Sequence, residues 1–225
     1  MTNIEILKQI IGENLEINEI TFAKFDGYQT FENRIELAGD LLDVYRHALD
    51  KKNEFEMPFW DSLNLSLFDR HISESKIFNQ ICFHNSPSVI RHVPKDKFDL
   101  FFTLLKETNE YWTINSKVSL RQSGWKHLFL LDFHIPVSSK NEKICIEVIK
   151  ALKVKGYLVD SGKSYHFYAK DLLSEEEMLS KLAQSLLFAP IVDRAWIAHQ
   201  IIERACCLRV SKKYDRLPLK VCFIE

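Results

Sequence analysis

The sequence predicts an α+β fold, in which a helix-rich segment over residues 1–85 precedes a domain of strands and helices over residues 86–225. Two stretches of the first segment, 3–12 and 32–52, place apolar side chains at helical spacing. In the second segment, residues 127–133 spell HLFLLDF, and a nearly continuous apolar run of this length is typical of a buried central strand. Strand-like and helix-like segments then follow in mixed order to the end of the chain, which favours this fold class.

Composition and charge restrict the function. The 225 residues carry 30 Lys and Arg against 31 Asp and Glu, so the formal net charge is −1 and a polyanion would need a local basic patch. No apolar run approaches the roughly 18–20 residues of a membrane span, and the first residues lack the features of a signal peptide. Five cysteines without a CxxC pair favour buried thiols in a reducing compartment over disulfides or a thiolate zinc site. We therefore expect a cytoplasmic protein with no membrane association.

The elements of the first segment follow from apolar spacing and helix breakers. Ile4, Leu7 and Ile10 give the first helix its apolar stripe, and Leu37, Leu41, Leu42, Tyr45 and Leu49 do so for the second. Residues 53–75 are predicted to be irregular, because Pro58 and scattered Ser and Asn argue against a long element.

The second segment predicts a longer series of elements. Pro94 can start a helix, and Ser174 with Glu177 forms a capping box that opens a later one. From residue 127 the order is strand, helix, strand, strand, helix, helix, strand, strand, and its first part is the split βαβ arrangement of ferredoxin-like and RNA-recognition-like folds. The remaining predicted strands are 111–115, 117–121, two within 156–169, 207–211 and 218–224, and the remaining predicted helices lie near 144–152 and after Pro190.

The first candidate site is LLDFHIP, which ends the apolar strand. Asp132 and His134 stand at positions i and i+2, which point to the same face of a strand. A carboxylate and an imidazole on one face can both ligate a divalent metal. The alternative is an Asp that caps the strand and a His that packs under a helix.

The second candidate site is DSGKSYH. Backbone N–H groups near Gly162, the Lys163 ammonium, the Ser164 hydroxyl and His166 can converge on a phosphate. A Ser-x-His pair also suggests nucleophilic catalysis, but side chains two apart on one strand leave their α-carbons roughly 7 Å apart, which makes direct proton transfer awkward. The alternative is a polar hairpin without a ligand.

The third candidate site lies near the C-terminus. Asp193 stands at the start of a predicted helix, and Arg209, Lys212, Lys213, Arg216 and Lys220 form a local basic cluster. Such a cluster suits a triphosphate or a nucleic-acid backbone. The alternative is a solvated sheet edge whose charges discourage edge-to-edge pairing.

The order of the three motifs resembles that of the archaeo-eukaryotic primase superfamily, which includes the small primase subunit and the primase-polymerases. In that family the first motif is an apolar strand ending in Asp-x-Asp or Asp-x-Glu, and the second is Ser-x-His on a later strand. The third is an apolar residue followed by an acid, with a downstream Arg and Lys before a Pro-containing strand. The corresponding stretches here are LLDFH at 130–134, SGKSYH at 161–166, VD at 192–193, and LRVSKK with Pro218 at 208–218.

The resemblance covers roughly residues 110–225 and implies an RNA-recognition-like catalytic core. It implies a nucleotidyltransferase that uses nucleoside triphosphates on a single-stranded DNA or RNA template, with attack of a 3′-hydroxyl on the α-phosphorus. The implied metal ligands for Mg²⁺ or Mn²⁺, which are also the implied catalytic residues, are Asp132, His134 and Asp193. The implied nucleotide-binding residues are Gly162, Lys163, Ser164, His166, Arg209 and Lys212.

One position departs from the family pattern. The first motif of the family has two acids, whereas this chain has Asp132 and then His134, which contributes no negative charge. A non-catalytic module that binds nucleotide or single-stranded nucleic acid is therefore an alternative. A metal-dependent hydrolase with Asp132, His134 and His166 as ligands is another. Residues 1–85 match no motif of the family, and we expect them to cap the core or to dock a protein partner.

Overall fold

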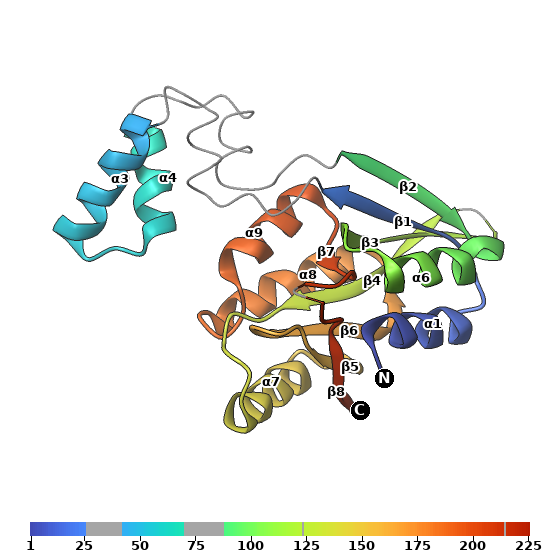
Figure 1. Ribbon diagram of the computed structural model, residues 1–225. Helices are drawn as coiled ribbons and strands as arrows, with labels where there is room; N and C mark the ends of the chain where they lie inside the picture. Colours follow the sequence, from blue (N-terminus) through green and yellow to red (C-terminus); the bar gives the residue numbers. More distant parts are fainter. Residues whose placement is uncertain (26–41, 70–87, 123, 214) are drawn as a thin grey trace. The chain divides into compact units, whose positions relative to one another are not determined.

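The computed structural model describes residues 1–25, 42–69, 88–122, 124–213 and 215–225. The chain forms two compact units: Met1–Asp26 together with Pro87–Glu225, and Gly27–Ser86 (Figure 1). The first 26 residues thus belong to the α+β unit, whereas the sequence placed them with the helix-rich segment 1–85. The reason is that they contribute a helix to its core and a strand to its sheet.

The larger unit contains both strands and helices, in mixed order along the chain. Its strands are β1 (Ile17–Phe25), β2 (Val89–Pro94), β3 (Tyr111–Leu120), β4 (Trp125–Asp132), β5 (Gly156–Asp160), β6 (Tyr165–Leu173), β7 (Cys207–Arg209) and β8 (Leu219–Ile224). Its helices are α1 (Asn3–Glu13), α6 (Phe98–Glu107), α7 (Ser139–Ala151), α8 (Glu175–Ser185) and α9 (Arg194–Glu203), with short 3-10 turns η1 (Lys95–Lys97) and η2 (Leu186–Phe188).

The strands form one antiparallel sheet in the order β2-β1-β3-β4-β6-β5-β8, and β7 pairs with β3. An antiparallel sheet covered by helices confirms the predicted α+β class. Strand β6 lies between β4 and β5, which are connected through α7. Because β4 and β5 are each antiparallel to β6, they run parallel to each other, one strand apart.

Several predicted elements differ from the observed ones. Residues 111–115 and 117–121 belong to the single strand β3, and β1 and β2 were not predicted. The region predicted to be irregular contains helix α4 (Phe59–Asp69), which begins directly after Pro58. The second predicted helix begins outside the described residues and is seen as α3 (Leu42–Phe55). Helix α9 begins at Arg194 rather than at Pro190, because Asp193 supplies its N-cap.

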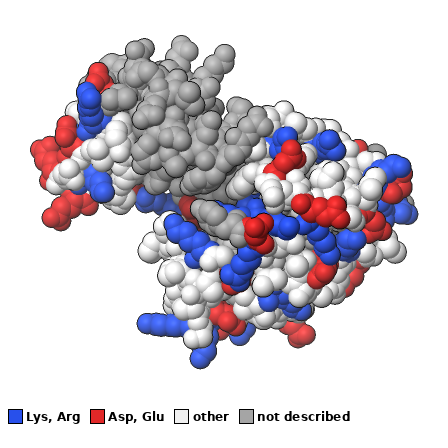
Figure 2. Space-filling model, in the orientation of Figure 1, with Lys and Arg blue, Asp and Glu red and all other residues white. Residues whose placement is uncertain are grey.

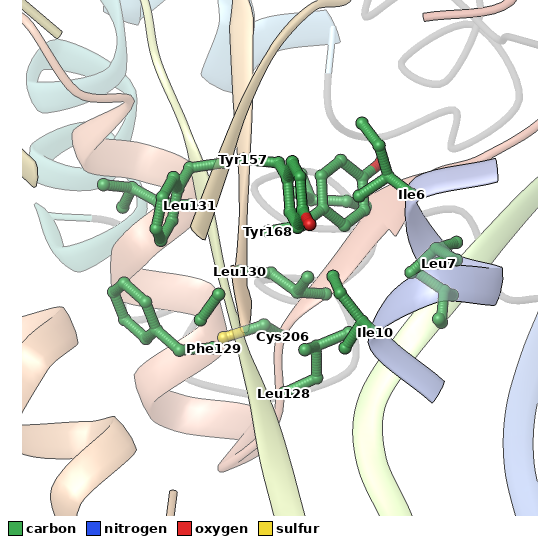
Figure 3. Close-up of a cluster of buried hydrophobic side chains, with 14 of the residues drawn as sticks. Ile6, Leu7, Ile10, Leu128, Phe129, Leu130, Leu131, Tyr157, Tyr168 and Cys206 are labelled. Carbon is green, nitrogen blue, oxygen red and sulfur yellow. The ribbon is translucent and has the colours of Figure 1, made fainter. Parts of the chain in front are cut away.

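Helix α1 covers one face of the central strands. Its side chains Ile6, Leu7 and Ile10 lie beside Leu130 and Tyr168, while the alternate residues of β4 point to the opposite face (Figure 3). A Thr2–Glu5 capping box starts this helix. Helix α6 contacts α1, and helices α8 and α9 contact β4. The face that α1 covers also carries Asp132 and His166 at its far end, since these residues alternate in phase with Leu130 and Tyr168.

The smaller unit contains a pair of helices, α3 and α4. Val44, Ala48 and Leu63 are buried, and the rings of Tyr45 and Phe59 meet edge to face with centroids 5.9 Å apart. Within the described residues, no helix is long and apolar enough to cross a membrane.

The packing of α1 gives a stability prediction. Replacing the fully buried Leu7 with Ala should lower the free energy of unfolding by about 2–4 kcal/mol, because it leaves a cavity against the sheet. Urea denaturation followed by circular dichroism measures the loss. The control is Leu15→Ala, which alters an exposed leucine just after the same helix and should cost less than about 0.5 kcal/mol. Equal effects of the two substitutions would show that α1 does not belong to the core.

Candidate active site

The site begins where β4 ends. Asp132, its last residue, pairs directly with His166 of β6. Cross-strand partners point to the same face, so the imidazole lies beside the carboxylate, with His166 Nε2 3.6 Å from Asp132 Oδ1. The imidazole is 8% exposed and the Asp132 side chain 23%. Asp132 Oδ1 and His166 Nδ1 are both buried and have no hydrogen-bond partner within the described part of the chain.

A second acid is held next to Asp132 by the backbone. The Asp193 N–H donates to the Asp132 carbonyl (3.0 Å), and the His134 N–H donates to the Ile191 carbonyl (2.8 Å). Between them, Phe133 forms a β-bridge with Val192. The first and third sequence motifs thus run side by side for three residues.

The side chain of Asp193 has two partners. Its Oδ1 accepts a hydrogen bond from the Trp196 N–H as the N-cap of α9, where the helix dipole favours a negative charge. Its Oδ2 lies 3.6 Å from His134 Nδ1. The His134 side chain is 70% exposed, so this contact is at the surface.

The DSGKS turn joins β5 to β6 beside this cluster. Gly162 has φ of +108°, a conformation that glycine adopts without strain, and its N–H donates to Asp160 Oδ1 (2.7 Å). The Ser161 hydroxyl donates to the Ser164 carbonyl (3.0 Å). The Gly162 N–H is therefore engaged within the turn, and the exposed Lys163 is the cation of the turn that faces solvent.

Two arginines anchor the turn to the C-terminal stretch. Arg209, 7% exposed, donates through Nη2 to the Ser161 carbonyl (2.8 Å) and through Nη1 to the Ser211 carbonyl (2.7 Å). Arg216 Nη2 contacts Asp160 Oδ2 at 2.6 Å. The predicted basic cluster thus fixes the predicted phosphate-binding turn in place.

The pKa values of Asp132 and His166 are shifted by burial and by neighbouring charges. Burial raises the pKa of Asp132 well above its ordinary value, and the Asp193 carboxylate raises it further, while Arg209 and Lys213 oppose the rise. Burial also lowers the pKa of His166 to about 3, helped by Arg209 and Lys213, so the imidazole is neutral at physiological pH. The pKa of Lys213 is lowered by burial and by the charges of Arg209 and Lys163. The site thus combines a carboxyl group that resists ionisation with several cations.

The charge of the site is local. Figure 2 shows Lys and Arg interspersed with Asp and Glu over the face in view, in keeping with the net charge of −1. No broad field of one sign is seen on that face. With a net charge of −1, attraction of a polyanion requires a local group of cations rather than the charge of the whole chain.

Whether these side chains fit a divalent metal depends on which donor atoms they offer and how many of them lie together. No group of three or more His, Cys, Asp or Glu among the described residues is arranged to hold a metal ion. The donors come instead as two pairs, Asp132 with His166 and Asp193 with His134. Mg²⁺ in nucleotide enzymes is commonly held by one or two carboxylates together with substrate phosphates, so the two neighbouring acids and the partnerless Asp132 Oδ1 fit such an ion.

The structure places the sequence-predicted residues close together. Asp132 pairs with His166 and Asp193 with His134, and a backbone bond joins Asp132 to Asp193. Arg209 holds the turn that carries Gly162, Lys163 and Ser164. Lys212 lies on the same C-terminal stretch and is partly exposed.

Two contributors were missed. Asn3 of α1 donates through Nδ2 to the Val210 carbonyl (3.0 Å), and Tyr168 donates to the Arg209 carbonyl (3.3 Å). Side chains two residues apart on a strand point to the same face, so His166 could have pointed to Tyr168. No local sequence pattern connects Asn3 with residue 210.

Comparison with known families agrees with this arrangement. Residues 97–221 match the family described as AEP-like, archaeo-eukaryotic primase 1D-like. The match spans more than half of the chain and includes all three motifs, so the chain belongs to this family, at the level of a divergent member of the archaeo-eukaryotic primase superfamily. No curated protein and no solved structure matches the chain.

The raised pKa of Asp132 predicts a pH-dependent stability. The pKa of Asp132 is higher in the folded state than its unfolded value of about 3.9, so the folded protein is most stable when this carboxyl group is protonated. Below about pH 3.9 the group costs no stability. As pH rises from there through the folded-state pKa, ionisation of Asp132 lowers the free energy of unfolding. Asp132→Asn is neutral throughout and should therefore be more stable than wild type at pH 8, by about 1–2 kcal/mol, with a difference that shrinks as pH falls to 5.

Urea denaturation across this range measures the effect. The lowered pKa of His166 destabilises the fold as pH falls, and this contribution is largely common to both proteins. Asp171→Asn, an exposed acid later on β6, is the control and should change stability by less than about 0.5 kcal/mol. An Asp132→Asn variant that is less stable than wild type at pH 8 would contradict the assigned burial penalty.

Proposed function

We propose that the protein is a nucleotidyltransferase that adds nucleoside triphosphates to a nucleic-acid strand on a single-stranded template. The observations that support the proposal are the backbone bond that brings Asp132 and Asp193 side by side and the bond from Arg209 to the turn that holds Lys163 and Ser164. Membership in the archaeo-eukaryotic primase-like family supports this class of reaction. The placement of β6 between β4 and β5 supports an RNA-recognition-like core for residues 86–225.

In this proposal the residues have separate roles. Asp132 and Asp193, with His134 at the surface, would hold Mg²⁺ or Mn²⁺, which when bound stabilises charge on the attacking and leaving oxygens. Lys163, which is exposed, and Ser164 and Lys212, which are partly exposed, would bind the triphosphate, and Arg209 would keep the turn in place. The 3′-hydroxyl of the growing strand attacks the α-phosphorus and pyrophosphate leaves. The chain contributes mainly position and charge to this reaction.

A primer-extension assay tests the proposal. With a labelled primer on a single-stranded template, ribo- or deoxynucleoside triphosphates and Mg²⁺ or Mn²⁺, wild type should extend the primer. Asp132→Asn and Asp193→Asn should each reduce the rate by roughly a hundredfold or more, because each removes a carboxyl group proposed to hold the metal ion. Asp171→Asn should leave the rate unchanged. Equal rates in all four proteins would rule out this site as the centre of the reaction.

A second candidate function is a non-catalytic module that binds nucleotide or single-stranded nucleic acid. The specific observation in its favour is His134, an exposed imidazole at the position where the family has an acid. In that case the wild type binds nucleotide and extends no primer with either metal. Docking of a protein partner through the N-terminal residues remains a prediction.

The departure at position 134 gives a direct test. His134→Asp should raise the affinity for Mg²⁺ and the rate of primer extension, because a carboxylate there adds a charge beside Asp193 Oδ2 without any change of backbone. His134→Asn, which is neutral and similar in size to Asp, is the matched control and should produce neither gain. If His134→Asp leaves both quantities level or lower, and Mn²⁺ outperforms Mg²⁺ in wild type, His134 is an adapted ligand instead.

A further inference from the structure

A groove lies between β2 and α6, at one edge of the sheet. Among the described residues β2 pairs only with β1, so it is the last strand on its side of the sheet (Figure 1). Each residue of the strand from Ile90 to Pro94 lines the groove, and the opposite wall is a stripe formed by Lys97, Leu100, Phe101 and Leu104. The groove has a volume of about 630 Å³, which accommodates several side chains of a bound peptide.

The groove follows the backbone edge of β2. Successive residues of a strand point to opposite faces, so a groove lined by every residue over 90–94 runs along the edge rather than over one face. In an antiparallel edge strand, every second residue turns its N–H and C=O groups away from its partner strand. No described strand pairs with these groups of β2, so they offer donors and acceptors to a further strand as far as Pro94, which has no N–H.

The groove also exposes apolar side chains. Leu100 is 72% exposed and Leu104 39%, and the two lie about one turn apart on α6. On β2, Ile90 is 58% exposed. Exposed apolar residues that gather at one place mark an interaction surface, whereas single ones scattered over a protein need no explanation. The groove therefore combines a pairing edge with an apolar wall.

The charge of the groove is positive. Among the described residues that line it, Arg91, His92 and Lys97 are basic and none is Asp or Glu. His92 lies 3.6 Å from Glu19, and Lys97 lies 3.8 Å from Asp96. Arg91 is exposed and forms no ion pair within the described part of the chain. A segment bound along β2 thus meets an uncompensated guanidinium group beside aliphatic side chains, and a carboxylate complements it.

The phenyl ring of the groove is not available for stacking. Phe101 is 6% exposed, and its ring packs on those of Phe22 and Trp112, with centroids 4.7 and 5.4 Å apart. Sites for single-stranded nucleic acid usually stack bases on exposed aromatic rings. Cations beside aliphatic side chains and a strand edge therefore favour an acidic peptide over a nucleic-acid strand.

We propose that the groove between β2 and α6 binds an extended segment of a partner protein that is rich in acidic and apolar residues, and that this segment adds to β2 as a further strand. Its apolar side chains pack on Leu100 and Leu104, and a carboxylate pairs with Arg91. β1 and β3 lie between β2 and β4, the strand that ends in Asp132, so this inference does not depend on the proposed function.

The test uses a synthetic peptide of about eight residues, labelled with a fluorophore, in which Leu and Glu alternate. The comparison peptide has Lys in place of every Glu. In the protein, Arg91→Glu reverses the uncompensated charge, and Leu100→Asp places a carboxylate on the apolar wall. Leu187→Asp changes an exposed leucine of η2, outside the groove, and is the matched control.

Fluorescence anisotropy with the full chain measures binding. We expect wild type to bind the Glu peptide about tenfold or more tightly than the Lys peptide. Arg91→Glu and Leu100→Asp should each weaken binding of the Glu peptide by about tenfold, whereas Leu187→Asp should stay within about twofold of wild type. Methylation of the backbone amides of all Leu residues, or of all Glu residues, should differ in effect by about tenfold, because only one of the two sets faces β2.

Hydrogen exchange followed by mass spectrometry gives a test that needs no variant. The Glu peptide should slow exchange in β2 and leave β8, at the other end of the sheet, unchanged. The inference is overturned if the Glu peptide does not bind at about 1 mM, if the Lys peptide binds as well, or if β2 gains no protection. It is also overturned if Arg91→Glu and Leu100→Asp bind as wild type does, or if the two methylated peptides behave alike.

Two other occupants are distinguished by the same proteins. Labelled oligothymidylate that protects β2 and loses its binding in Arg91→Glu but not in Leu100→Asp would assign the groove to single-stranded nucleic acid. A dimer of wild type that sedimentation detects, and that Leu100→Asp abolishes, would assign the groove to a second copy of the chain. Either result would overturn the proposed partner.

Discussion

The pairing of β4 with β6 is the constraint on which the rest of the site depends. Because side chains alternate along a strand, a slip of one residue in either strand would turn Asp132 and His166 to opposite faces of the sheet. The hydrogen-bonded register of the two strands therefore places the acid opposite the imidazole. Helix α1 strengthens the same constraint, since it covers the apolar part of that face and leaves its end for polar side chains.

The polar end of this face is costly to the fold. Burial of Asp132 beside a second acid raises the pKa of Asp132, and its Oδ1 has no hydrogen-bond partner among the described residues. His166 is neutral and buried, and its Nδ1 also has no partner there. The buried Arg209 and the half-buried Lys213 offset part of the cost, because their charges lower the pKa of Asp132. Strongly shifted groups that gather at the ends of two central strands favour a functional role.

The sequence predicted the parts of the fold that local patterns specify. Apolar periodicity found α1, a nearly continuous apolar run found most of β4, and the capping box at Ser174 found the start of α8. The pattern failed for β1 and β2, because their side chains follow no clean alternation of apolar and polar residues. The motifs gave the residues of the site, but the bond from Arg209 to Ser161 joins positions 48 apart, and only the folded sheet specifies such a contact.

The exchange of an acid for His134 can be understood from the geometry around it. Position 134 lies beyond the end of β4, where a bridge to the segment before α9 holds the backbone and the side chain stays largely in solvent. A change there alters charge without disturbing the core, whereas a change at Asp132 would alter the buried end of the sheet. A cation held by the remaining two carboxylates would need further oxygens, which the phosphates of a substrate can supply. In the proposed site the metal and the nucleotide would bind more tightly together than either does alone, so the missing acid would weaken the resting site more than the loaded one.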